Sequence, residues 1–180
     1  MPLVVLVGGA RSGKSALAVD LARRQASATT VVLATAEPRD EEMRARTERH
    51  RRERPAEWAV VEEPLSLEAT LARIDGEACV IVDCLTVWVA NLLEAGRDDA
   101  AIEGEAGRAA ALAAGRAGTT IAVTNEVGSG IVPADAGTRR YRDALGRVNA
   151  CWAGRADQAL LVVAGLGVPL HPPEPLLGAS

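Results

Sequence analysis

Short apolar runs alternate along the chain with longer segments rich in Ala, Arg and Glu. Within each run the apolar residues are nearly continuous, which indicates strands that are buried on both faces of a sheet. Helical patterns separate the runs, so consecutive strands are expected to be parallel and joined by crossover helices. The pattern predicts strands over residues 3–7, 30–35, 58–61, 79–82, 119–124 and 159–164, with a short final strand within 165–170.

The segments between the apolar runs carry helical periodicity. Pro55 ends one of them, because the residue before a proline is disfavoured in helical backbone. Helices are predicted over residues 13–25, 39–54, 65–74, 85–94, 101–116 and 137–153. The fold class is therefore α/β, with a mostly parallel sheet flanked by helices. Residues 1–170 form one predicted domain, and the Pro-rich residues 171–180 form a predicted mobile tail.

The last predicted helix carries an apolar stripe. Tyr141, Leu145, Val148 and Trp152 recur at helical spacing. Such a stripe packs either in the core or against a neighbouring subunit.

Composition and charge narrow the class of protein. The 180 residues fit one domain. A net charge of −4 argues against a general nucleic-acid binder. Cys79, Cys84 and Cys151 lack CxxC spacing, which favours reduced thiols over disulfides or a zinc site. No uncharged stretch approaches the roughly 18 residues of a membrane span, so the predicted location is cytoplasmic.

A phosphate-binding pattern, GxxxxGK[ST], lies between the first predicted strand and the first helix. It consists of Gly8, Gly9, Ala10, Arg11, Ser12, Gly13, Lys14 and Ser15. Backbone N–H groups of such a loop converge on phosphate oxygens, and the following helix N-terminus favours negative charge. Lys14, the only lysine of the chain, is expected at the β and γ phosphates, and Ser15 is expected to ligate Mg²⁺.

Polar residues follow two further predicted strands. Asp83 ends the apolar run 79–82, as expected of a carboxylate that holds Mg²⁺, although buried strands also end in aspartates of no function. Asn125 and Glu126 follow the strand 119–124, at the sheet edge where ligands of open α/β sheets gather. Nearby glycines leave a plain turn as the alternative for this second pair.

Three further segments are more particular than these motifs: DCLTVWVANLL at 83–93, TNEVGSGIVP at 124–133 and RYRDALGRVN at 140–149. Together with the phosphate loop, they resemble the bifunctional adenosylcobinamide kinase/adenosylcobinamide-phosphate guanylyltransferase family of cobalamin biosynthesis. The resemblance runs from Leu3 to about Leu170, with the motifs in the family's order and spacing. Residues after Leu170 do not match the family pattern.

The resemblance implies a RecA-like P-loop fold, a trimer and two activities. One activity phosphorylates the aminopropanol hydroxyl of adenosylcobinamide with ATP or GTP. The other transfers GMP from GTP to that phosphate through a guanylylated histidine and releases pyrophosphate. The resemblance also implies that the strand 119–124 lies between the two phosphate-site strands, so that Asn125 and Glu126 lie near the phosphates.

The nucleotidylated histidine that the resemblance implies is His50, in a charged helix that ends in Arg-Pro. Its competitor, His171, lies in the Pro-rich tail. Six arginines crowd the same helix, where a solvated face of i,i+4 ion pairs is the alternative to a phosphate site. Arg140 and Arg147 likewise lie either at the surface or against phosphate or corrinoid.

Three other functions remain open from the residues alone. A P-loop kinase without a covalent intermediate would not need His50. A non-enzymatic nucleotide switch would show negligible turnover with any cobinamide. An RNA-binding role for the arginine helix has the least support, because the chain is acidic and lacks interleaved basic and aromatic residues.

Overall fold

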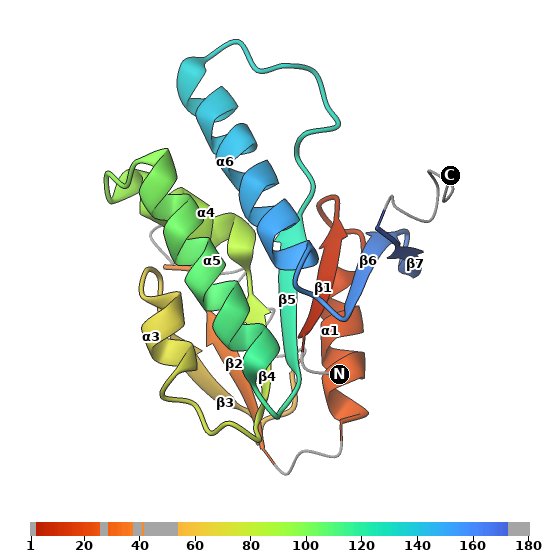
Figure 1. The fold of residues 1–180 in the computed structure, drawn as a ribbon. Coiled ribbons are helices and arrows are strands. Elements are labelled where there is room, and N and C mark those ends of the chain that lie inside the picture. Colours follow the sequence, from red (N-terminus) through yellow and green to blue (C-terminus); the bar gives the residue numbers. More distant parts are fainter. Residues whose placement is uncertain (1–2, 26–28, 38–40, 42–53, 173–180) are drawn as a thin grey trace, which may run out of the picture.

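The computed structural model describes residues 3–25, 29–37, 41 and 54–172. Within these residues one sheet of seven strands has the order β3-β2-β4-β5-β1-β6-β7 (Figure 1). The strands are β1 (Leu3–Gly8), β2 (Thr30–Ala34), β3 (Ala59–Glu62), β4 (Cys79–Asp83), β5 (Thr120–Asn125), β6 (Gln158–Val163) and β7 (Leu166–Leu170). All neighbouring strands pair in parallel except β7, which returns antiparallel to β6.

Helices cover both faces of the sheet (Figure 1). They are α1 (Lys14–Arg23), α3 (Leu67–Leu71), α4 (Leu85–Glu94), α5 (Asp99–Gly115) and α6 (Ala136–Ala153). A hydrophobic core lies on each face of the sheet, and successive residues of β1 point alternately into the two cores. Val5 packs with α4, α5 and α6 on one face, whereas Leu6 packs with α1 on the other. Burial of β1 on both faces explains why its sequence is continuously apolar.

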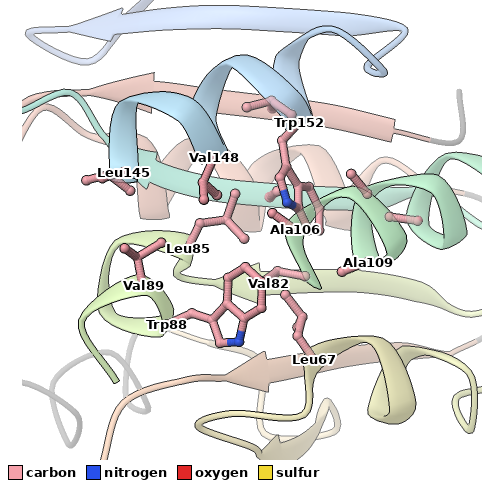
Figure 2. Packing of buried hydrophobic residues seen from close by; sticks show 14 of the residues in the cluster. Leu67, Val82, Leu85, Trp88, Val89, Ala106, Ala109, Leu145, Val148 and Trp152 are labelled. Carbon is pink, nitrogen blue, oxygen red and sulfur yellow. The ribbon is translucent and has the colours of Figure 1, made fainter. Parts of the chain in front are cut away.

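The larger core lies between the sheet and the helices α4, α5 and α6, whose side chains converge in Figure 2. Leu145, Val148 and Trp152 are fully buried there, so the stripe of α6 packs in the core and not against another subunit. Trp88 is buried in the same cluster, and its indole N–H donates a hydrogen bond to the Leu65 carbonyl oxygen at 2.9 Å.

Within the described residues, the predicted strands and helices are confirmed, and side-chain hydrogen bonds explain two of the shifted helix starts. The helix predicted at 101–116 begins earlier, at Asp99, because Asp98 accepts a hydrogen bond from the Ala101 N–H at 2.8 Å. The helix predicted at 65–74 is shorter and spans only Leu67–Leu71. There Glu63 accepts hydrogen bonds from the N–H groups of Leu65 and Ser66, which holds these two residues in a turn.

Two predicted segments fall largely outside the described residues. Of the helix predicted at 39–54, only Glu41 and Arg54 are described, and of the tail only His171 and Pro172 are described. Among the helices that the structure does describe, none has the length and apolar character needed to cross a membrane.

Candidate active site

The phosphate loop connects β1 to α1, and its sharp path requires glycine at two positions. A Cβ atom at Gly8 would lie 2.3 Å from the Val162 carbonyl oxygen, and Gly13 has φ of 100°, in the left-handed region. Side chains other than hydrogen are strained there. Because Gly13 is left-handed, α1 begins one residue later than predicted, at Lys14.

Lys14 is buried inside this loop. Its ammonium group donates hydrogen bonds to the carbonyl oxygens of Gly8 at 2.9 Å and Gly9 at 2.6 Å, and to the Ser12 hydroxyl at 3.3 Å. The first turn of α1 follows at once, so a lysine cation and the positive end of a helix lie together. This arrangement favours bound phosphate.

Ser15 and Asp83 line one cavity of about 160 Å³ beside the phosphate loop. Ser15 lies in the first turn of α1, and Asp83 is the last residue of β4. Arg54 lines the same cavity, and its guanidinium group lies 2.5 Å from an Asp83 carboxylate oxygen. Only 12% of the Asp83 side chain is exposed, so the Arg54 charge balances a largely buried carboxylate.

The donor set of this cavity fits Mg²⁺ bound together with a nucleotide. Among the lining residues, Ser15 offers one hydroxyl oxygen, and Asp83 and Asp20 offer one carboxylate each. Within the described ranges, no three His, Cys, Asp or Glu side chains gather into a metal-binding group. Mg²⁺ commonly takes one or two protein oxygens and completes its shell with water and substrate phosphates, so two protein donors are sufficient.

Asn125 and Glu126 lie directly against the phosphate loop. Asn125 pairs in register with Gly8, and the Glu126 N–H donates to the Gly8 carbonyl oxygen at 3.1 Å. The Glu126 carboxylate also accepts a hydrogen bond from the Gly128 N–H, which makes a turn. The turn and the proximity to the phosphate loop, weighed as alternatives in the sequence, therefore coexist.

Sequence reasoning missed the residues that tie the strand ends together. Thr35 donates to the Cys84 carbonyl oxygen at 2.8 Å and accepts from the Cys84 N–H at 2.9 Å. Asn91 donates to the carbonyl oxygens of Thr35 and Pro64. In the sequence Arg54 is one arginine of a charged run, and no local pattern indicates its contact with Asp83.

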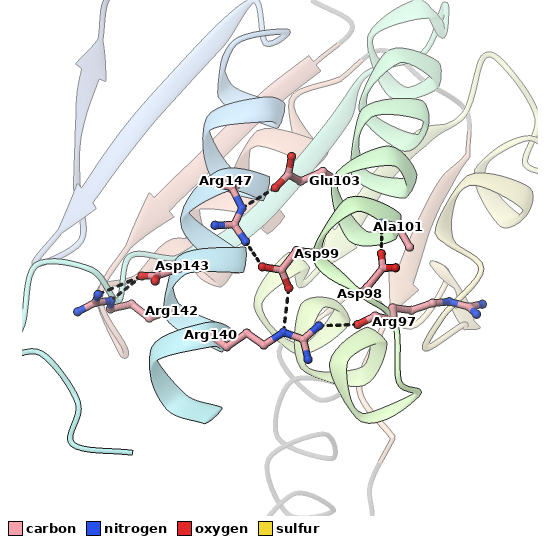
Figure 3. Close-up of polar contacts among 9 residues, drawn as sticks. All are labelled: Arg97, Asp98, Asp99, Ala101, Glu103, Arg140, Arg142, Asp143 and Arg147. Carbon is pink, nitrogen blue, oxygen red and sulfur yellow. Dashed lines mark hydrogen bonds and ion pairs between the residues drawn. The ribbon is translucent and has the colours of Figure 1, made fainter. Parts of the chain in front are cut away.

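His50 lies outside the described residues, so its position relative to the phosphate loop is a prediction. Arg140 and Arg147 are described, and both donate to the Asp99 carboxylate of α5, at 2.8 and 2.6 Å (Figure 3). Arg147 also pairs with Glu103. These exposed ion pairs favour the surface interpretation of the two arginines. The hydrogen bond from Arg140, together with both positive charges, lowers the pKa of Asp99.

Comparisons with solved structures confirm the fold. A protein from Pyrococcus horikoshii OT3 superposes with a TM-score of 0.57 at 8% identity, covering 93% of this chain and 84% of that one. An ATPase from the type III secretion system of pathogenic bacteria superposes with a TM-score of 0.50 at 12% identity, covering 93% and 56%. At these identities the likeness shows the α/β P-loop fold alone.

Sequence comparisons identify the family as well as the fold. The family model described as cobinamide kinase / cobinamide phosphate guanyltransferase matches residues 4–170. The bifunctional adenosylcobalamin biosynthesis protein CobP of Pseudomonas aeruginosa is 43% identical over 96% of this chain and 98% of its own length. The corresponding CobU protein of Escherichia coli is 37% identical over 92% and 98%. The chain therefore belongs to the cobinamide kinase / cobinamide phosphate guanyltransferase family.

Proposed function

We propose that the protein carries out two transfers in adenosylcobalamin biosynthesis. It phosphorylates adenosylcobinamide with ATP or GTP, and it transfers GMP from GTP to adenosylcobinamide phosphate. The observation that carries the proposal is a complete phosphate loop beside Asp83, in a chain that matches bifunctional relatives over nearly its whole length. ATP, GTP, adenosylcobinamide and its phosphate are the proposed substrates.

For the kinase step, each protein group has a role set by its place. The backbone N–H groups of residues 9–15 and the Lys14 ammonium bind and orient the triphosphate. Ser15 and Asp83 would hold Mg²⁺, which would supply positive charge to offset the negative charge of the phosphates. An ion held by Asp83 would compete with Arg54, so nucleotide and metal binding is expected to release the Arg54 side chain.

For the guanylyl step, we assign the nucleophile to His50. An imidazole nitrogen attacks the α-phosphorus of GTP, forms a P–N bond, and breaks the P–O bond to the β-phosphate, which releases pyrophosphate. A phosphate oxygen of adenosylcobinamide phosphate then attacks the same phosphorus and frees the histidine. Arginines flank His50 in the sequence, and because cations close to an imidazole disfavour a further positive charge, we expect the neutral, nucleophilic form.

We also propose that the protein assembles as a homotrimer. The family resemblance supports it, and so does β7, an edge strand that exposes Leu166, Val168 and Leu170. Exposed apolar edge strands commonly pair or are covered in the native assembly.

Product analysis tests the two transfers separately. Purified protein is incubated with adenosylcobinamide, Mg²⁺ and ATP, and the corrinoid products are identified by liquid chromatography with mass spectrometry. Adenosylcobinamide phosphate is the expected product. Adding GTP to that phosphate should give adenosylcobinamide-GDP and one equivalent of pyrophosphate. Phosphate formation without GDP formation would indicate a kinase alone, and no product at all would contradict both activities.

A further inference from the structure

A cluster of buried polar side chains lies behind the carboxyl end of β5. It joins three elements: Thr86 of α4, Thr124 of β5 and Asn149 of α6. Thr124 is fully buried, and Thr86 and Asn149 are each only 8% exposed. Polar groups at this depth are costly unless their hydrogen bonds are made, so the pattern of bonds inside the cluster defines its geometry.

The donors and acceptors of the cluster can be assigned without ambiguity. The Thr124 hydroxyl donates to the Asn149 side-chain oxygen at 2.7 Å, so the Asn149 amide nitrogen faces the Asn125 carbonyl oxygen and donates to it at 3.0 Å. Because Thr124 has given its only proton, Thr86 is the donor in the 3.4 Å contact between the two hydroxyls. The Thr86 hydroxyl in turn accepts from the Asn125 N–H at 2.7 Å.

These bonds hold one short piece of backbone from several sides. The Asn125 N–H is bound by Thr86, and the Asn125 carbonyl oxygen is bound by Asn149. The next N–H, that of Glu126, donates to the Gly8 carbonyl oxygen, which also accepts from the Lys14 ammonium at 2.9 Å. One peptide group therefore connects the buried cluster on one side to the phosphate loop on the other.

We propose that Thr86 and Asn149 are positioning residues for phosphoryl transfer, and that they act by fixing the backbone of Asn125 and Glu126 against Gly8 and Lys14. The inference rests on the proposed function, since it assumes that the phosphate loop is the reaction site. Neither side chain needs to touch substrate. Small displacements of groups around the reacting phosphate reduce turnover more than they reduce ground-state binding.

A purely structural role for the cluster predicts a different result. Loss of a buried hydrogen bond would then lower the unfolding temperature, while the folded fraction would keep the kcat and KM of the wild type. The positioning role predicts a lower kcat in protein that is fully folded. The two interpretations separate when turnover is measured well below the unfolding midpoint of every variant.

The test uses Thr86→Val, which has nearly the same shape and lacks the hydroxyl, with Thr86→Ser as the conservative variant that restores it. The matched control is Thr120→Val at the opposite end of β5. Thr120 is fully buried too, and its hydroxyl has no hydrogen-bond partner among the described residues. Asn149→Asp is the second variant: an ionised carboxylate at this position still accepts from Thr124 and does not donate to Asn125.

For Thr86→Val and Asn149→Asp we expect kcat of adenosylcobinamide phosphorylation to fall about tenfold, with KM for the nucleotide within about threefold of wild type. Thr86→Ser and Thr120→Val should stay within about twofold of wild type. A wild-type kcat in folded Thr86→Val, no recovery in Thr86→Ser, or failure of both variants to fold would overturn the proposal.

Hydrogen exchange of the peptide spanning 121–130 gives a readout that does not depend on cobinamide. The amides at the end of β5 should exchange faster in Thr86→Val and at the wild-type rate in Thr120→Val. Suppose that exchange is faster in Thr86→Val and unchanged in Thr120→Val, but the wild type phosphorylates no cobinamide. The proposed function then fails, while the coupling to the phosphate loop stands. Unchanged exchange in Thr86→Val would overturn the coupling itself.

Discussion

Lys14 is the side chain that we propose binds the triphosphate. It is the only lysine in the sequence, and its ammonium group is bound to the carbonyl oxygens of Gly8 and Gly9. An arginine is planar and bulky, whereas a lysine offers a compact charge that fits inside the loop. We therefore expect that no neighbouring arginine can take the place of Lys14 in the loop.

Lys14→Ala is expected to lower both the kinase and the guanylyltransferase rate by about 100-fold or more, because we propose that both reactions bind their nucleoside triphosphate in the same phosphate loop. Initial rates with each substrate measure the effect. Arg108→Ala, which removes an exposed cation of α5 paired with Glu68, serves as the control and should retain full activity. Near-normal turnover of Lys14→Ala in either reaction would contradict a shared phosphate site.

Asp83→Asn tests the metal role of the strand-end carboxylate. The change keeps the side-chain size and removes the charge that holds Mg²⁺, so the Mg²⁺ concentration for half-maximal activity should rise about tenfold. Nucleotide affinity without Mg²⁺, measured by calorimetry, should change little. Asp20→Asn, in the same cavity wall, is the matched control and should leave the Mg²⁺ dependence as it is. Equal Mg²⁺ dependence in Asp83→Asn and wild type would exclude the role.

The site residues differ in how directly the neighbouring sequence indicates them. The phosphate loop, Asp83 and Asn125 could be predicted because each lies directly after an apolar strand, and the ends of parallel strands meet at one edge. Arg54 and Thr86 could not be predicted in this way. Their partners Asp83 and Asn125 lie 29 and 39 residues away along the chain, and no local pattern indicates such contacts.

Among the elements, strands were predicted more accurately than helix ends. Each predicted strand overlaps an observed one and its bounds differ by one residue or less, because burial on both faces leaves a continuous apolar run. Helix ends depend on single side chains instead. Asp98 extends α5 and Glu63 shortens α3, and both effects rest on hydrogen bonds to backbone N–H groups that periodicity does not reveal.

Glu63 gives a pH-dependent prediction for the start of α3. Partial burial alone would raise its pKa, but hydrogen bonds from the N–H groups of Ser66 and Leu65 outweigh this, so the pKa lies below the ordinary 4.5. A lowered folded-state pKa stabilises the fold above the unfolded-state value, and this stability is lost as the pH falls through the folded-state pKa.

We therefore expect Glu63→Gln to lower the free energy of unfolding by about 1 kcal/mol at pH 7, and by less as the pH falls below about 4.5. Denaturant unfolding at pH 7 and pH 3.5 measures both values. Glu62→Gln, at the exposed neighbouring position, is the control and should leave the free energy of unfolding unchanged at both pH values. A difference between wild type and Glu63→Gln that stays constant with pH would refute the assignment.

At the scale of the whole molecule, the strand order brings the site together. The observed order places β5 between β1 and β4, so the phosphate loop, Asn125 and Asp83 follow adjacent strands. The family resemblance implied this order, and it is confirmed. Periodicity could not supply it, because apolar runs indicate which segments are strands but not which strands are neighbours.

The assembly state is the second question at this scale. The α6 stripe packs in the core, so it no longer argues for an oligomer, and the expectation of a trimer rests on the resemblance and on the exposed apolar residues of β7. Light scattering at micromolar concentration should give about three times the 18.7 kDa chain mass. A monomer mass under these conditions would contradict the trimer.

The most direct test of the whole account is covalent labelling of wild type and His50→Ala with α-³²P and γ-³²P GTP, followed by denaturing electrophoresis. Wild type should retain label from the α position only, through a bond that is labile in acid and stable in alkali, as expected of a phosphoramidate. His50→Ala should lose the label and GMP transfer while it still phosphorylates adenosylcobinamide, because that step needs the phosphate loop and Mg²⁺ but no covalent intermediate. Acid-labile α label that persists in His50→Ala would contradict the account.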